Sequence, residues 1–190
     1  QSSADLSYAT GGESAAKVGL GYWRILPEYV SEESFDQDLF IRPLPNTFAV
    51  HLGPHTMPDG SDAKYGFIIE FMPEESFKET FPGKKWKSNE FDELSDQLPY
   101  WRTGTNIAVV DYFCLKRNRH TLYFLADGTT ITKEDYDKWP EEAGVKPSVQ
   151  DERTTFSEKL KWTKMTGVEV LEERDLPGKY IPIIEVIGRE

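Results

Sequence analysis

The stretch that decides the fold is Asn106-Ile107-Ala108-Val109-Val110-Asp111-Tyr112-Phe113-Cys114-Leu115-Lys116-Arg117-Asn118-Arg119-His120-Thr121-Leu122-Tyr123-Phe124-Leu125. Residues 107–115 and 121–125 are apolar and rich in the β-branched and aromatic side chains that are typical of strands. The segment between them, residues 116–120, is polar and basic. Two strand-like runs around a polar segment are typical of a hairpin, so the sequence predicts a β-hairpin with its tip at residues 116–120.

Further strands are predicted on both sides of this unit. Before it lie a hairpin of residues 22–26 and 38–42 and short strands at 47–52 and 65–72, the last two separated by the Pro- and Gly-rich loop 53–62. After it, Asp127-Gly128 predicts a turn. Residues 156–166 and 168–171 are expected to pair across Gly167, and Leu176-Pro177-Gly178 is expected to turn the chain into a final buried strand within residues 181–190.

The predicted helices are few and mostly short. Residues 4–20 favour a helix with a weak apolar stripe of Leu6, Ala9, Ala16 and Leu20, ended by Gly19 and Gly21. Shorter helices are predicted after Pro73, over residues 90–98 with Asn89 as the cap, and from Thr132 towards Trp139. Residues 141–152 are polar and predict a mobile loop. The sum is a single α+β domain over residues 1–190, with a mostly antiparallel sheet, hairpins and a few short helices.

Both ends of the chain suggest a piece of a longer protein. Gln1 is not a methionine, residues 4–20 resemble the later part of a helix, and residues 181–190 resemble a buried strand with nothing after it. We therefore expect a fragment of a larger subunit.

Composition limits the function classes. Aromatic residues make up 13% of the 190 residues, which is unlike a disordered chain. No apolar stretch approaches the roughly 20 residues of a membrane-spanning helix, so we expect no membrane partner. Cys114 is the only cysteine, which excludes an intrachain disulfide and fits a reducing compartment. The net charge of −11 argues against a sequence-independent grip on DNA, although it suits a surface past which DNA must slide.

Histidines and acidic residues offer two weak metal motifs. His51 and His55 have the spacing of helical zinc ligands, but Gly53 and Pro54 between them disfavour a helix, and His120 is distant in the chain. Ordinary loop histidines are the favoured interpretation. The segment Asp59-Gly60-Ser61-Asp62 resembles part of a calcium loop, but it lacks the alternating ligands and the closing glutamate, which favours a polar turn. We expect no metal site and no cofactor.

Catalytic and phosphate-binding arrangements are similarly weak. The close carboxylates Glu32, Glu33, Asp36 and Asp38 suit acid–base hydrolysis in principle, but such pairs arise by chance in an acidic chain. Lys116, Arg117, Arg119 and His120 offer contacts to phosphate, against the plainer interpretation of a solvated hairpin tip. We therefore predict no catalytic residues and no enzymatic activity.

Three stretches in order resemble the portal proteins of short-tailed bacteriophages. The first is Gly19-Leu20-Gly21-Tyr22-Trp23-Arg24-Ile25 with Phe35-Asp36-Gln37-Asp38-Leu39-Phe40-Ile41-Arg42. The second is Pro58-Asp59-Gly60-Ser61-Asp62-Ala63-Lys64-Tyr65-Gly66-Phe67 with residues 73–82, and the third is Leu176-Pro177-Gly178-Lys179-Tyr180-Ile181-Pro182-Ile183. Together they cover nearly the whole chain. Gly53 departs from the pattern, because an acidic residue is expected before Pro54.

The resemblance implies a structural subunit without an active site. Such subunits form a dodecameric ring that replaces one capsid vertex and provides the channel through which DNA enters and leaves, without sequence-specific binding. The ring docks terminase and later the tail adaptors, and it contacts capsid and scaffolding proteins. The implied location is the portal vertex of the virion, and the host cytoplasm during assembly. By the same analogy the segment is a wing-like region that reaches towards the clip.

Two other functions stay open from the sequence. A phage-encoded protein-binding module with another target would present exposed aromatic residues such as Trp86, Tyr100 or Trp101. A small carboxylate-dependent hydrolase would hold two close acids with raised pKa values in a deep pocket.

Overall fold

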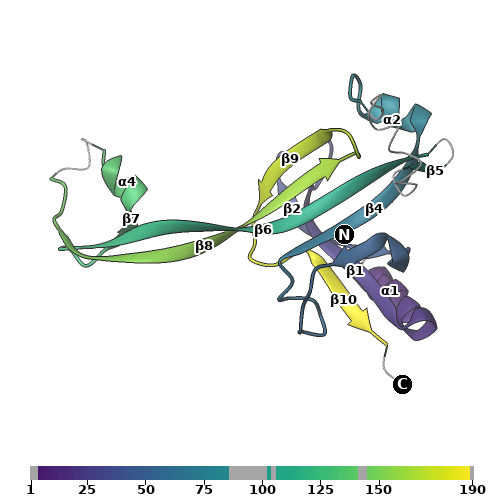
Figure 1. Ribbon diagram of the computed structural model, residues 1–190, viewed down its shortest axis with the longest axis horizontal. Coiled ribbons are helices and arrows are strands. Elements are labelled where there is room, and N and C mark those ends of the chain that lie inside the picture. Colours follow the sequence, from purple (N-terminus) through teal and green to yellow (C-terminus); the bar gives the residue numbers. More distant parts are fainter. Residues whose placement is uncertain (1–3, 86–101, 104–105, 141–144, 189–190) are drawn as a thin grey trace. The chain divides into compact units, whose positions relative to one another are not determined.

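The computed structural model describes residues 4–85, 102–103, 106–140 and 145–188 (Figure 1). The helices are α1 (Ala4–Val18), α2 (Glu74–Thr80) and α4 (Lys133–Asp137), with a 3-10 turn η1 (Thr47–Ala49). The strands are β1 (Leu20–Tyr29), β2 (Gln37–Leu44), β3 (Val50–Leu52), β4 (Tyr65–Pro73), β5 (Arg102–Thr103), β6 (Asn106–Leu125), β7 (Thr130–Thr132), β8 (Val149–Met165), β9 (Val170–Leu176) and β10 (Ile183–Ile187). The observed pairings are antiparallel, which confirms the α+β class.

The first sheet joins the two ends of the chain. Its strand order is β10-β1-β2, with Trp23 opposite Ile184 on one side and opposite Pro43 on the other. The predicted hairpin of residues 22–26 and 38–42 is confirmed and extends to Tyr29 and Gln37. The predicted strand within residues 181–190 is also confirmed over Ile183–Ile187.

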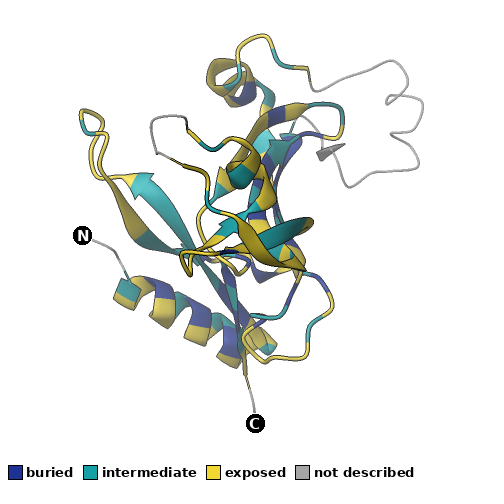
Figure 2. Cartoon of the chain, turned by 90° about the vertical axis from the view of Figure 1, so that its left-hand side faces the viewer, coloured by how far each residue is buried: buried dark blue, intermediate teal, exposed yellow. Residues whose placement is uncertain are grey.

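Helix α1 covers this sheet with a face that the apolar pattern did not predict. Its buried residues are Ser7, Gly11 and Ala15, whereas the predicted stripe of Leu6, Ala9, Ala16 and Leu20 is exposed (Figure 2). The stripe was wrong because the helix packs by close approach of its backbone, for which small residues are needed. Ser7 Oγ also donates a hydrogen bond to the Ile41 carbonyl oxygen, at 3.1 Å. The predicted end of the helix is confirmed, since Gly19 has φ of +87°.

The second sheet has the order β3-β4-β6-β8-β9, with β5 and β7 also paired to β6. The predicted hairpin tip at residues 116–120 is wrong, because β6 continues through it as one strand of 20 residues. Main-chain pairing does not require apolar side chains, so an exposed polar segment can continue a ladder. The chain reverses instead at Asp127-Gly128, where Gly128 has φ of +83° and Asp127 Oδ1 accepts the Thr129 amide hydrogen at 2.9 Å.

Other local predictions are confirmed with changed limits. Residues 47–52 divide into η1 and β3. The predicted pairing of residues 156–166 with 168–171 is confirmed between β8, which ends at Met165, and β9, which begins at Val170. Strand β8 begins at Val149, so the end of the loop predicted for residues 141–152 is a strand. Helix α2 begins after Pro73 as predicted, and Thr132 caps α4. The helix predicted over residues 90–98 lies outside the described residues.

The chain divides into two compact units. The first comprises residues 1–115 and 160–190, and the second comprises residues 116–159. The core of the first unit joins both sheets through Tyr22, Leu44, Val50, Ile68, Phe113, Leu160, Trp162, Ile181 and Ile183. A smaller cluster combines Phe77 of α2 with Ile107, Val109 and Leu171. The prediction of one domain stays a prediction.

The second unit is held by aromatic and polar contacts. The rings of Tyr123 and Tyr136 meet edge to face with centroids 5.3 Å apart, and the Tyr136 hydroxyl donates to the Pro147 carbonyl oxygen at 2.8 Å. The Arg117 guanidinium lies 3.8 Å from the centroid of the Phe156 ring.

Across the described ranges, no helix is long and apolar enough to span a membrane.

Candidate functional site

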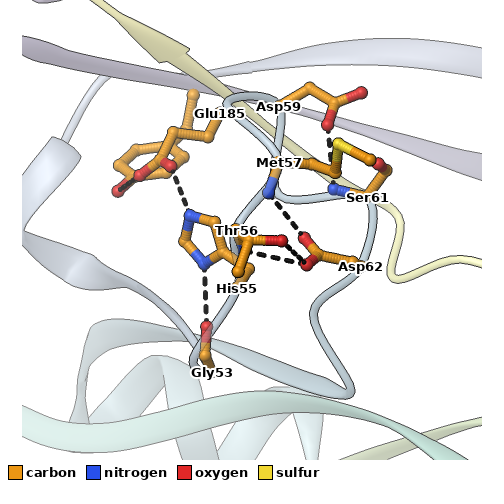
Figure 3. A network of polar contacts seen from close by, with 9 residues as sticks. Gly53, His55, Thr56, Met57, Asp59, Ser61, Asp62 and Glu185 are labelled. Carbon is orange, nitrogen blue, oxygen red and sulfur yellow. Dashed lines mark hydrogen bonds and ion pairs between the residues drawn. The ribbon is translucent and has the colours of Figure 1, made fainter.

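The loop of residues 53–62, between β3 and β4, is organised by its own carboxylates (Figure 3). Asp62 accepts hydrogen bonds from the Thr56 amide at 2.8 Å, the Thr56 hydroxyl at 2.7 Å and the Met57 amide at 3.0 Å. Asp59 Oδ1 accepts from the Ser61 amide at 3.1 Å. Gly60 completes the turn with φ of +70°. The segment that resembled a calcium loop therefore uses its carboxylates to close a polar turn.

These hydrogen bonds stabilise the charged carboxylates. The Thr56 hydroxyl and amide, followed by the Met57 amide, lower the pKa of Asp62 to about 2. The pKa of Asp59 is lowered mainly by its hydrogen bonds from Ser61. Both groups thus carry negative charge at neutral pH, and neither has the raised pKa that a catalytic acid requires.

The same loop is tied to the first sheet through His55. Its Nδ1 lies 2.8 Å from the Gly53 carbonyl oxygen and its Nε2 lies 2.8 Å from Glu185 Oε2 in β10 (Figure 3). The Tyr22 hydroxyl in β1 donates to Glu185 Oε1 at 2.7 Å. The Glu185 side chain is only 7% exposed and that of His55 is 21% exposed. One buried carboxylate therefore joins two strands and the loop.

The pKa values of this group follow from its partners. The Gly53 carbonyl raises the pKa of His55 more than any other group, and Glu185 and Asp62 add to the rise against the opposing effect of burial. Burial raises the pKa of the Tyr22 hydroxyl above its usual range, helped by the adjacent Glu185 carboxylate. Tyr22 is thus a permanent donor at physiological pH.

A second polar cluster surrounds Asp111 inside β6. Its carboxylate accepts from Trp162 Nε1 at 3.1 Å and lies 3.4 Å from Arg24 Nη1 and 3.6 Å from Lys164 Nζ. Asp111 is 5% exposed. Asp111 lies within an apolar run of the sequence and was not predicted as a site residue, and a lone acid within such a run is the signal that could have identified it.

An apolar groove of about 570 Å³ opens on the first unit. Its walls come from β1, β2, the end of β9 and the segment that leads into β10. They include Ile25, Leu26, Leu39, Leu176, Tyr180 and Ile181. Among the described residues, the acid that lines the groove is Asp59, and no second acid pairs with it in the way expected for a carboxylate-dependent hydrolase.

The structure does not bring the predicted metal candidates together. The His51 ring stacks on Phe67 with centroids 4.8 Å apart, His55 is held by Gly53 and Glu185, and His120 belongs to the second unit. In the part of the chain that the structure describes, no group of three or more His, Cys, Asp or Glu side chains could hold a metal ion. Cys114 is a partly buried free thiol.

The remaining candidates lie on the surface of their units. Glu32, Glu33, Asp36 and Asp38 are exposed in or beside the connection between β1 and β2, where Asp38 Oδ1 accepts its neighbour's amide hydrogen at 2.7 Å. The basic residues Lys116, Arg117 and Arg119 are exposed along β6. The aromatic candidates Trp86, Tyr100 and Trp101 lie outside the described residues.

Comparison with known families decides among the functions that the sequence left open. The model of the phage P22-like portal protein family matches residues 1–190. The chain belongs to this family. Portal proteins are structural components of the phage capsid and act as head-to-tail connectors, and the resemblance seen in the sequence is thereby confirmed. No curated protein matches the chain.

In a portal protein, a buried polar network such as that of Glu185 can serve to hold the shape of the subunit. Portal proteins form oligomeric rings that associate with capsid and terminase. Such a protein works through the shape that its subunits keep, so a buried carboxylate joining β1, β10 and the 53–62 loop contributes by fixing that shape.

Proposed function

We propose that the chain forms part of a dodecameric portal ring at one capsid vertex, whose channel lets DNA enter and leave. The observation that carries this proposal is the family match over the whole of residues 1–190. In this role the protein docks terminase during packaging and the tail adaptors afterwards, and it contacts capsid and scaffolding proteins during assembly in the host cytoplasm. It performs no catalysis of its own.

We further propose that residues 1–190 form a wing-like region that reaches towards the clip. The mostly β architecture supports this assignment. The longest described helix, α1, has 15 residues, which is about 22 Å at 1.5 Å per residue. The described residues therefore supply packed sheets for the body of the subunit, and long channel-lining helices would come from elsewhere in the subunit.

The charge distribution supports passage of DNA without a tight grip. The net charge is −11, and residues 116–159 contain eight Lys or Arg against nine Asp or Glu, which gives 8 − 9 = −1. The first unit therefore carries −11 − (−1) = −10. A strongly acidic surface repels the phosphate backbone, so this part of the subunit would not hold DNA by a sequence-independent grip.

Labelling of assembled particles tests the location. A phage carrying an epitope tag on the portal gene would be imaged by electron microscopy after decoration with a gold-labelled antibody. The proposal predicts label at one vertex of each capsid. Label at many vertices, or only on tails, would contradict it.

Docking of terminase requires a separate test. The full-length protein and the terminase of the same phage would be mixed and separated by sedimentation. Co-sedimentation of terminase with portal particles is expected, whereas independent sedimentation at micromolar concentrations of both would refute the docking proposal. A portal bearing the variant Gly12→Ala, an exposed helix position with open space around it, controls for unspecific effects of substitution.

A further inference from the structure

The His55 ring lies between two hydrogen-bond acceptors. Nδ1 faces the Gly53 carbonyl oxygen and Nε2 faces Glu185 Oε2, both at 2.8 Å (Figure 3). A carbonyl oxygen can only accept, so a hydrogen bond at the Gly53 contact requires a proton on Nδ1. An ionised carboxylate can also only accept, and Glu185 Oε1 already accepts from Tyr22.

A neutral imidazole cannot satisfy both acceptors, because it has one N–H group. With that hydrogen on Nδ1, the lone pair on Nε2 would face a carboxylate oxygen at 2.8 Å. With it on Nε2, the lone pair on Nδ1 would face the Gly53 carbonyl oxygen at 2.8 Å, so each neutral tautomer leaves one repulsive contact. If Glu185 is ionised, hydrogen bonds at both contacts therefore require a proton on each ring nitrogen, which is one more than a neutral histidine carries. The imidazole holds this proton, because its ordinary pKa lies about two units above that of a carboxyl group.

We propose that His55 is a proton-operated latch, which holds the 53–62 loop on β10 through both ring nitrogens when the imidazole is charged and holds it more loosely when the imidazole is neutral. A main-chain hydrogen bond from the Glu185 amide to the Asp59 carbonyl oxygen, at 3.2 Å, joins the same two elements. The latch therefore controls how firmly this acidic loop is held.

The charged groups around His55 all raise its pKa. Glu185 approaches it from β10 and Asp62 from within the loop, while Tyr22 of β1 reaches the same carboxylate as an uncharged donor. The Gly53 carbonyl has the largest effect, and together these groups raise the pKa of His55 against the effect of burial. The latch is fully closed below the ordinary histidine pKa of about 6.5, and it opens as the pH rises through the raised pKa of the folded protein.

A histidine titration by nuclear magnetic resonance tests the protonation directly. The chain has three histidines, so the His55→Gln variant assigns its ring signals by their loss. The His55 midpoint is expected above about 6.5, and Glu185→Gln is expected to reduce the protonation constant by about tenfold, which is one pKa unit. A wild-type midpoint at or below about 6.5, or one that Glu185→Gln leaves unchanged, would overturn the proposal.

Amide hydrogen exchange tests the loosening of the loop. Protection factors of the amides in residues 56–62, measured relative to those of β1, are expected to fall several-fold as the pH passes the His55 midpoint. His55→Leu, which has no hydrogen-bond donor, should show the low protection at every pH, whereas His51→Gln, which removes only a stacked surface ring, should behave as the wild type. If Glu185→Gln does not fold, the wild-type pH series still decides, because equal protection on both sides of the midpoint would refute the latch.

Discussion

The carbonyl oxygen of Gly11 in α1 lies 1.9 Å from the position that a Cβ atom on Gly21 of β1 would occupy. No Cβ atom can be accommodated at that distance, so the helix contacts the strand by its bare backbone. The same contact places the Gly11 Cα 3.1 Å from that position. Packing of α1 on the first sheet therefore depends on two glycines that are ten positions apart in the sequence.

Substitution of Gly21 is expected to loosen this contact. Gly21→Ala should lower the free energy of unfolding by about 3 kcal/mol, because an added methyl group forces backbone atoms apart in a packed region. Gly12→Ala serves as the control, since its Cβ would meet nothing within 4 Å, and it should stabilise the helix by about 0.5–1 kcal/mol. Urea denaturation of both variants provides the measurement, and a Gly21→Ala protein as stable as the wild type would contradict the packing.

Removal of the buried Asp111 charge should be more damaging than removal of a surface charge. Asp111→Asn leaves Arg24 and Lys164 without their shared carboxylate, and we expect a loss of about 2–3 kcal/mol in the free energy of unfolding. Glu28→Gln breaks the more exposed pair with Arg42 and should change stability by less than about 1 kcal/mol. Equal losses in the two variants, measured by chemical denaturation, would argue against a special role for Asp111.

The free energy of unfolding at acidic pH should depend on the ionisation of Asp62. Its pKa is about 2 in the folded protein and about 3.9 for an ordinary aspartate, so the charged form stabilises the fold above about pH 4. That contribution is lost as the pH falls from about 4 to about 2. Thr56→Ala removes the hydroxyl donor and should move the Asp62 midpoint upward, as read from its carboxyl carbon chemical shift. An Asp62 midpoint near 3.9 in the wild type would show that the loop is not closed by these hydrogen bonds.

The continuity of β6 can be tested with proline. Asn118→Pro removes an amide donor in the middle of a strand and should abolish exchange protection around residues 116–120. Lys133→Pro, at the first position of α4, is the control, because proline is tolerated there. A tolerated Asn118→Pro would instead favour the hairpin tip that the sequence suggested.

Short-range signals in the sequence were sufficient for most elements of the fold. The turns at Asp127-Gly128 and Leu176-Pro177-Gly178 and the helix starts at Pro73 and Thr132 all depend on local chemistry, and each is close to where it was predicted. The failures concern long-range packing. The polar segment within β6 resembled a turn because its strand pairing comes from distant residues, and the buried face of α1 was missed because close backbone approach leaves no apolar pattern.

The polar networks could not be predicted from the sequence, because their members are far apart along the chain. His55 and Glu185 are 130 positions apart, and Asp111 and Trp162 are 51 positions apart. Each of these side chains gains its role only from the partner that the fold brings to it. The family could be identified because motifs retain their order along the chain, whereas a buried network requires the three-dimensional arrangement.

The most direct test of the central claim is electron microscopy of the purified full-length protein that contains these residues. Negative-stain images are expected to show rings with a central hole, and class averages should have twelve-fold rotational symmetry. Uniform small particles without rings, at high protein concentration and in the presence of the capsid and scaffolding proteins, would contradict the assignment to a portal ring.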